Sequence, residues 1–89
     1  MLDITKQARK FLDSLPPKQF KQVGSKLIGL LRVPYPNDCK HLSGHPSYRR
    51  VDIGEYRICY TVMDSTIRIV VFGKRNDDSV YNLLKQARR

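Results

Sequence analysis

The sequence predicts an α+β sandwich in which an N-terminal helical hairpin packs on a twisted antiparallel sheet. Two segments carry apolar residues at helical spacing, and three later segments have the alternating or continuous apolar pattern of strands, with tight turns between them. Helices followed by a run of antiparallel strands are typical of two-layer α+β domains. We therefore expect two helices, a three-strand meander and a short helix at the end of the chain.

A first helix is predicted after Thr5, whose side chain can cap it. Apolar residues then recur at positions i, i+3, i+4 and i+7, namely Ala8, Phe11, Leu12 and Leu15. Pro16-Pro17 ends this helix because a proline ring cannot continue a helix interior. Residues 1–4 are placed to add an N-terminal edge strand to the sheet.

The second helix is expected to begin at Pro17, since proline suits the first helical position. Its apolar stripe comprises Phe20, Val23, Leu27, Leu30 and Leu31. The turn-forming prolines, asparagine and aspartate of residues 34–38 end the helix. The outward positions of both helices are basic, which is typical of a solvated face and would also make a positive surface. These positions are Lys6, Arg9, Lys10, Lys18, Lys21, Lys26 and Arg32.

Residues 34–47 predict a polar connection, because Gly44 and Pro46 disfavour a helix there. His41 and His45 have the spacing of a metal pair on a helix, but no carboxylate or third histidine completes a ligand set. We therefore predict no metal and no cofactor. Cys39 and Cys59 form no C-x-x-C pair, which argues against a zinc site or a disulfide framework.

Tyr48 to Tyr60 reads as a β-hairpin whose turn is Gly54-Glu55, with glycine supplying the positive φ of a type II′ turn. One face then carries the pairs Ile53 with Tyr56 and Val51 with Ile58. The other face carries the pairs Asp52 with Arg57 and Arg50 with Cys59.

Arginines on a rigid strand can hold a phosphate through two parallel hydrogen bonds, so Arg50 and Arg57 are candidate anion-binding residues. The alternative is that Arg57 only pairs with Asp52 as a surface salt bridge. The hairpin pattern alone leaves both interpretations open.

The third strand is expected over residues 66–72, after a tight turn at Asp64-Ser65. Strict alternation puts Ile67, Ile69 and Val71 on one face and Arg68, Val70 and Phe72 on the other. The strand is apolar on both faces toward its end, as expected for a central strand.

A last helix is predicted after the capping residues 76–79, with an apolar face formed by Val80, Leu83, Leu84 and Ala87. Tyr81, Lys85 and Arg88 share one flank of this helix, so that an aromatic ring lies among positive charges. Such a combination suits single-stranded RNA, where rings stack on bases and cations contact phosphates. A phenol among cations can also have a lowered pKa, which a proton-transfer role requires.

The chain has 89 residues, of which 40% are hydrophobic, so we expect one domain, residues 1–89, with a modest core. A formal net charge of +9 predicts a polyanionic partner, whether nucleic acid, an acidic protein or an anionic surface. No apolar run is long enough for a membrane span or a signal peptide, which favours a cytoplasmic protein without membrane association.

Three motifs together resemble the RelE/ParE superfamily of bacterial toxins, and the RelE branch in particular. The motifs are Lys40-x-Leu42-x-Gly44, the hairpin with its Gly54-Glu55-Tyr56-Arg57 turn, and Val71-Phe72-Gly73-Lys74-Arg75 followed by Val80-Tyr81. The resemblance covers nearly the whole chain and implies a RelE-like microbial RNase fold. It also implies a ribosome-dependent endoribonuclease that cuts messenger RNA in the A site without a metal.

The resemblance implies specific site residues. Arg57 and Arg75 would stabilise the phosphate, Tyr81 would stack on RNA and assist proton transfer, and Arg50 would take the basic strand position. The expected RNA-binding residues are Arg49, Lys74, Lys40, Lys85 and Arg88. The implied partners are an acidic RelB-like antitoxin, the ribosome and messenger RNA, with operator DNA contacted only through the antitoxin.

Asp52 departs from the family pattern, which often has a second Lys or Arg at this position. Arg49 or Lys74 could compensate for this anion, or the activity could be weak. Two other functions stay open, a ParE-like inhibitor of DNA gyrase and a basic binding module without catalysis. ParE-type relatives share the fold and generally lack the arginine and tyrosine set.

Overall fold

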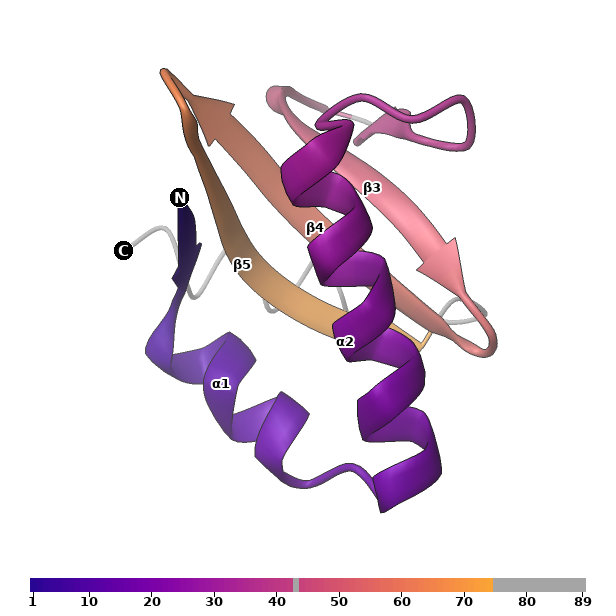
Figure 1. Cartoon of the computed structure of the whole chain (residues 1–89). Helices are drawn as coiled ribbons and strands as arrows, with labels where there is room; N and C mark the ends of the chain where they lie inside the picture. Colours follow the sequence, from indigo (N-terminus) through magenta and orange to yellow (C-terminus); the bar gives the residue numbers. More distant parts are fainter. Residues whose placement is uncertain (43, 75–89) are drawn as a thin grey trace.

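The computed structural model describes residues 1–42 and 44–74, and within them one sheet is covered on one face by two helices (Figure 1). The helices are α1, Lys6–Asp13, and α2, Pro17–Arg32. The strands are β1, Leu2–Ile4; β2, Lys40–Leu42; β3, His45–Ile53; β4, Tyr56–Met63; and β5, Thr66–Lys74. They lie in the order β1-β5-β4-β3-β2.

The predicted helical hairpin and the meander β3-β4-β5 are confirmed, and so is the N-terminal edge strand. β1 pairs with β5 in parallel, with Leu2 opposite Ile67 and Ile4 opposite Ile69. The remaining pairs in this sheet are antiparallel. The predicted C-terminal helix lies outside the described residues.

The expectation of a polar connection over residues 34–47 was wrong in part. Lys40–Leu42 forms β2 at the far edge of the sheet, and β3 begins at His45. A three-residue strand is too short to show an alternating pattern, although Leu42 is 1% exposed and so marks the buried side.

Helix α2 buries a narrower stripe than the sequence predicted. Val23, Leu27 and Leu30 are buried, whereas Phe20 is 45% and Leu31 is 41% exposed. At 100° per residue, Phe20 and Leu31 lie at one flank of the arc that the three buried residues define, and the sheet does not cover that flank. The apolar pattern identified the helix correctly but overestimated the width of its buried face.

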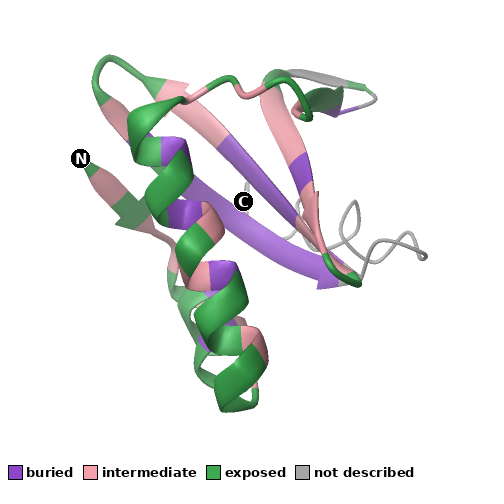
Figure 2. Ribbon diagram, turned by 45° about the vertical axis from the view of Figure 1, so that its right-hand side comes forward, coloured by how far each residue is buried: buried purple, intermediate pink, exposed green. Residues whose placement is uncertain are grey.

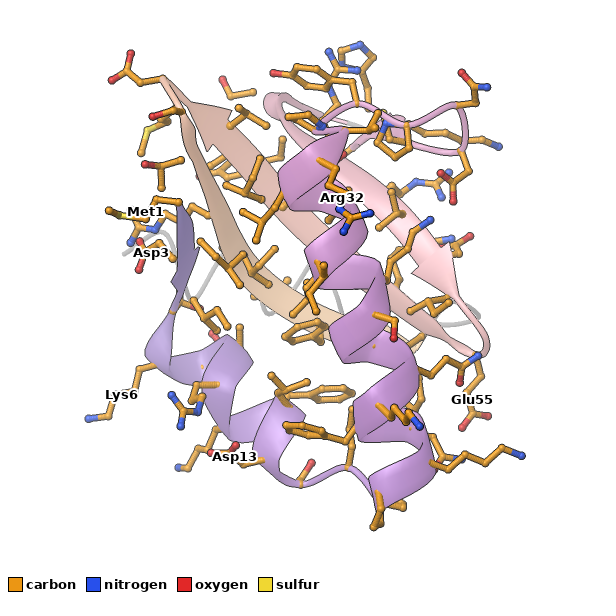
Figure 3. All side chains as sticks on the ribbon, viewed as in Figure 1. Met1, Asp3, Lys6, Asp13, Arg32 and Glu55 are labelled. Carbon is orange, nitrogen blue, oxygen red and sulfur yellow. The ribbon has the colours of Figure 1, made fainter. Side chains whose placement is uncertain are left out.

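The main core lies between the helices and the sheet, where the buried positions of α2 and of the strands face one another (Figure 2). Phe11 of α1 stacks on Phe72 of β5, with ring centroids 5.6 Å apart, and meets the Tyr56 ring edge-on at 5.8 Å. Charged side chains such as Lys6, Arg32 and Glu55 point away from this core (Figure 3). The predicted solvated face of the helices is therefore present.

A β-bulge in β5 corrects the predicted alternation of that strand. Cys59 pairs with Val71 but the next residue, Tyr60, pairs with Ile69, so Val70 is an extra residue. The bulge shifts the alternation by one, and Phe72 therefore joins Ile67 and Ile69 in the core beneath the helices. Val71 instead packs with Cys59 and Val70 in a second cluster.

Thr5 connects this bulge to the start of α1. Its hydroxyl donates to the Val70 carbonyl oxygen at 2.6 Å and accepts from the Ala8 backbone N–H at 3.2 Å. Its own backbone N–H donates to the Ile69 carbonyl oxygen at 3.0 Å. One residue therefore caps the helix and satisfies a carbonyl of the bulge.

Replacing Thr5 by valine should lower the free energy of unfolding by about 1–2 kcal/mol, because the helix loses its cap and the Val70 carbonyl loses a partner. Urea denaturation measures this change. Thr5→Ser retains the hydroxyl and should recover most of the loss. Equal urea midpoints for Thr5→Val and the wild type would contradict the role assigned to this hydroxyl.

No helix in the described part of the chain is long and apolar enough to cross a membrane.

Candidate functional site

The sheet face opposite the helices carries the charged residues of the predicted hairpin. The observed register pairs Val51 with Ile58, Asp52 with Arg57 and Arg50 with Cys59, as predicted. Gly54 has φ +58° and permits the tight turn that sets this register. Lys40 of β2 pairs with Arg50, so its Cα lies at the same cross-strand position. We call this surface the open face because α1 and α2 both lie on the other side of the sheet.

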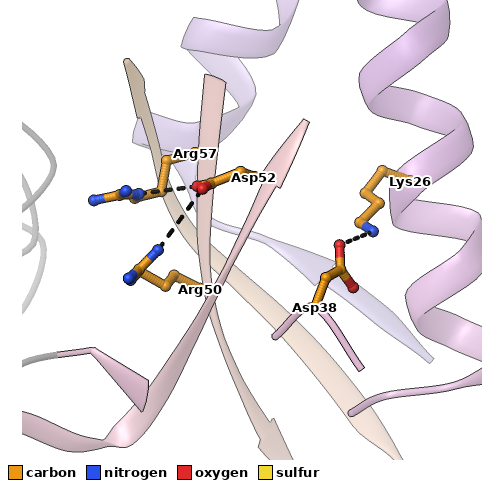
Figure 4. A network of polar contacts seen from close by, with 5 residues as sticks. All are labelled: Lys26, Asp38, Arg50, Asp52 and Arg57. Carbon is orange, nitrogen blue, oxygen red and sulfur yellow. Dashed lines mark hydrogen bonds and ion pairs between the residues drawn. The ribbon is translucent and has the colours of Figure 1, made fainter. Parts of the chain in front are cut away.

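Asp52 contacts two arginines on this face (Figure 4). Arg57 Nε is 3.0 Å from Asp52 Oδ1, and Arg50 Nη1 is 3.8 Å from Asp52 Oδ2. The Arg57 and Arg50 side chains are 15% and 21% exposed. The two interpretations of the sequence are therefore compatible, because the ion pair exists and both guanidinium groups still lie on one face.

The ion pair leaves much of the hydrogen-bonding capacity of Arg57 available. It uses Nε, and among the described residues neither Nη group has a hydrogen bond. In Figure 4 the ends of the two guanidinium groups lie on the same side of Asp52. Strand pairing and the shared carboxylate restrict both side chains, which lowers the entropy cost of binding an anion there.

Cys59 lies beneath these arginines and is 0% exposed. Burial raises the pKa of its thiol to about 12, and the charges of Arg57 and Arg50 lower it by less. The thiol is therefore protonated at neutral pH and is not a nucleophile there. The candidate chemistry of the open face rests on its cations.

Thiol chemistry tests this placement of Cys59. With iodoacetamide at about pH 8, the half-buried Cys39 should be alkylated in the native protein and Cys59 only after unfolding in urea. Mass spectrometry of proteolytic fragments distinguishes the two sites. Labelling of native Cys59 at the rate of Cys39 would show that the open face is not packed as described.

The same burial gives a pH dependence of stability. Because the folded state holds the Cys59 proton more tightly, its contribution is complete below the ordinary thiol pKa of 9.0 and is lost as the pH rises toward about 12. The buried Tyr60 phenol has a raised pKa and acts in the same direction. The urea midpoint of unfolding should therefore fall as the pH rises through this alkaline range. In Cys59→Ala the midpoint should depend less steeply on pH.

The predicted RNA-binding residues do not all share the open face. Arg49 pairs with Tyr60, a core residue beneath the helices, and its guanidinium carbon lies 4.6 Å from the Tyr35 ring centroid. The sheet therefore separates it from Arg50 and Arg57. Lys40 is exposed, and Lys74 ends β5 opposite Tyr56.

Four further predicted site residues, Arg75, Tyr81, Lys85 and Arg88, lie outside the described residues. No group of three or more His, Cys, Asp or Glu side chains that could hold a metal ion occurs within residues 1–42 and 44–74.

A depression that the sequence did not predict lies elsewhere on the open face. It has a volume of about 380 Å³ and is lined by Thr5, Ser47, Tyr48, Thr61, Met63, Arg68 and Val70. These residues come from four segments that only the sheet brings together, so no local motif could have indicated them. A second cavity, of about 360 Å³, lies between the end of α2 and residues 33–37 on the helical side.

Comparison with known proteins agrees with the fold. Residues 2–79 match the family described as the ParE toxin of the type II toxin-antitoxin system parDE. A search of curated protein sequences gives no match.

Solved structures of RelE toxins are similar over most of the chain. A mutant of the Escherichia coli toxin RelE in the free state is 24% identical, with TM-score 0.79, 97% of this chain and 94% of that chain covered. The toxin in the intact E. coli RelBE toxin-antitoxin complex is 26% identical, with TM-score 0.74 and coverages of 86% and 98%. In the archaeal RelE-RelB complex from Pyrococcus horikoshii OT3 the values are 29%, 0.74, 84% and 93%.

Proposed function

The chain belongs to the ParE toxin family of type II toxin-antitoxin systems, and from this premise we propose that it arrests growth by cutting messenger RNA on the ribosome. The observation that carries the proposal is the pair Arg50 and Arg57, fixed by Asp52 on the open face of a rigid sheet. Two restrained guanidinium groups at one point can together hold the oxygens of a phosphate on which negative charge develops during cleavage.

Cleavage would occur by attack of a ribose 2′-hydroxyl on the adjacent phosphate, which forms a 2′,3′-cyclic phosphate and breaks the bond to the 5′-oxygen of the next nucleotide. The attacking hydroxyl gives up a proton, and the leaving 5′-oxygen takes one up. The reaction needs a polarised phosphate, in-line geometry and acceptors and donors for protons. The Nη groups of Arg57 and Arg50 would hold the phosphate oxygens and stabilise the negative charge that develops in the transition state. Positioning by the ribosome would supply the in-line geometry.

The resemblance assigns the remaining chemistry to Arg75, as a further phosphate ligand, and to Tyr81, as a stacking and proton-transfer residue. Lys40, Lys74, Lys85 and Arg88 would add contacts to the RNA backbone. Arg49 lies on the helical side of the sheet, so its contribution to RNA binding would be weaker than the sequence pattern suggested.

The partner would be an acidic antitoxin in the cytoplasm. The similar E. coli RelBE and P. horikoshii RelE-RelB structures are toxin-antitoxin complexes, and a formal net charge of +9 favours an acidic chain as the neutralising partner. Covering the open face would be the direct way to inhibit the toxin.

Inhibition of DNA gyrase is the second candidate, because the matching family is named for the ParE toxin and Asp52 reduces the positive charge between the arginines. ParE-type relatives share the fold but act on gyrase. This alternative requires no RNA chemistry, and so it predicts intact messenger RNA in arrested cells.

Inducible expression of the chain with mapping of messenger RNA 5′ ends, on and off ribosomes, separates these functions. The proposal expects new 5′ ends within codons, only where ribosomes are present. Intact messenger RNA with inhibited supercoiling by purified gyrase would favour the ParE-like function. Normal growth with well-folded protein would indicate a binding module without catalysis.

A further inference from the structure

We propose that the depression lined by Tyr48, Thr61, Met63 and Arg68 is a subsite for a nucleotide that flanks the cleaved linkage. This inference rests on the proposed function, since it assumes that RNA lies along the open face. It adds a contact away from the arginine pair, on residues to which no role has been assigned.

The position of the depression suits a continuous strand of RNA. Arg57, Thr61 and Met63 are separated by even numbers of residues along β4, so their side chains project from the same face. The rise along a strand puts Thr61 about 13 Å from Arg57. A single-stranded RNA held at its scissile phosphate by Arg57 can therefore reach the depression with a neighbouring nucleotide.

The size of the depression also fits. Its volume of about 380 Å³ lies within the range of roughly 300–1,000 Å³ that is usual for small-ligand sites.

The shape of the depression depends on where β3 and β4 pair. β3 and β4 are in register from Ile53–Tyr56 to Arg49–Tyr60, and beyond this pair the Thr61 hydroxyl donates to the Ser47 carbonyl oxygen at 2.9 Å.

The lining residues offer the contacts that an unpaired nucleotide uses. Tyr48 is partly buried against the cluster formed by Leu42, Cys59, Val70 and Val71, and it lines the depression. This packing restrains an aromatic ring of the kind that stacks on unpaired bases. Met63 is 51% exposed and adds an adaptable apolar surface at the wall. Arg68 supplies a cation for the phosphate.

Arg68 has a partner that restrains it without removing its charge. Its Nε lies 3.6 Å from Asp3 Oδ2, and the two side chains are 47% and 56% exposed. An ion pair this exposed is weak, so an RNA phosphate can compete with Asp3 for the guanidinium. Asp3 belongs to β1, so the edge strand would help to orient a residue of the subsite.

The test measures binding of single-stranded oligoribonucleotides, from a dinucleotide to a hexanucleotide, to the full chain by fluorescence anisotropy. Wild-type affinity should rise when the RNA becomes long enough to reach the depression. Tyr48→Leu preserves apolar packing but removes the ring, and should reduce this length-dependent gain by about fivefold or more. Tyr48→Phe, the matched control, should retain it.

Arg68→Ala should weaken binding of the longer RNAs and lower the slope of log affinity against log salt by about one. Asp3→Asn, which removes only the partner of Arg68, should leave binding equal or tighter. Both residues are exposed, so these variants are expected to fold even if Tyr48→Leu is destabilised.

Three outcomes are distinguishable. Loss of the length-dependent gain in Tyr48→Leu and Arg68→Ala, with dinucleotide binding unchanged, supports the subsite. Binding that depends on Arg57 but keeps its full length dependence in both variants overturns the subsite and leaves the proposed function standing. Absence of length-dependent RNA binding by the wild type overturns the subsite, and intact messenger RNA in arrested cells overturns the proposed function as well.

Discussion

Replacing Arg57 by alanine is expected to lower the rate of RNA cleavage by about 10²- to 10³-fold, the loss usual when one donor aimed at a developing negative charge is removed. Arg57 combines low exposure with Nη groups that have no hydrogen bond among the described residues, so it is the guanidinium best placed to act on a phosphate. The rate is measured by adding each purified variant to ribosomes that carry a defined messenger RNA and following cleavage of that RNA. Growth after induced expression measures the effect in cells.

Two variants control for loss of charge and loss of fold. Arg57→Lys keeps the charge without the planar fork, so it should recover only part of the rate. Arg32→Ala removes an exposed charge at the end of α2, on the opposite side of the sheet from Arg57. This variant should cleave RNA at the wild-type rate. A wild-type rate in Arg57→Ala, with the fold intact, would remove Arg57 from the proposed site.

Replacing Phe72 by alanine is expected to lower the free energy of unfolding by about 3–5 kcal/mol. The side chain is 1% exposed and stacks on Phe11, so its loss removes buried apolar surface and opens a cavity between α1 and β5. A domain of this size has a total stability of about 5–15 kcal/mol, so the variant should be largely unfolded at moderate urea.

Urea denaturation followed by circular dichroism measures this loss. Phe72→Leu fills most of the volume and should cost clearly less than Phe72→Ala. Val71→Ala removes fewer buried carbons from the smaller cluster on the opposite face, and its cost should also be lower. A loss below that of Val71→Ala would show that Phe72 is not at the centre of the core.

Local sequence signals predicted most of the architecture. Thr5 and the two prolines set the helix boundaries, and Gly54 set the hairpin register, because caps and tight turns depend on nearby residues. β2 and the bulge at Val70 were missed because both depend on a partner strand. A three-residue strand has no period of its own, and Val70 is as apolar as its neighbours.

For the candidate site, the sequence predicted which residues share a face of the sheet but not how their side chains contact one another. The hairpin alternation correctly put Arg50, Asp52 and Arg57 together, because a period of two fixes the face once the turn is known. It could not show that one carboxylate holds both guanidinium groups, since that depends on rotamers. The depression was also out of reach, because its residues are distant in sequence and carry no shared motif.

The pairing of β1 with β5 has a consequence for the synthesis of the protein. The sheet joins Leu2 to Ile67 and Ile4 to Ile69, so its first strand finds its neighbour only after most of the polypeptide has been translated. Contacts this far apart in sequence make folding slow, and domains complete their folding as units. An emerging chain should therefore remain incompletely folded until β5 has left the exit tunnel, and under the proposed function it would gain its activity only after that point.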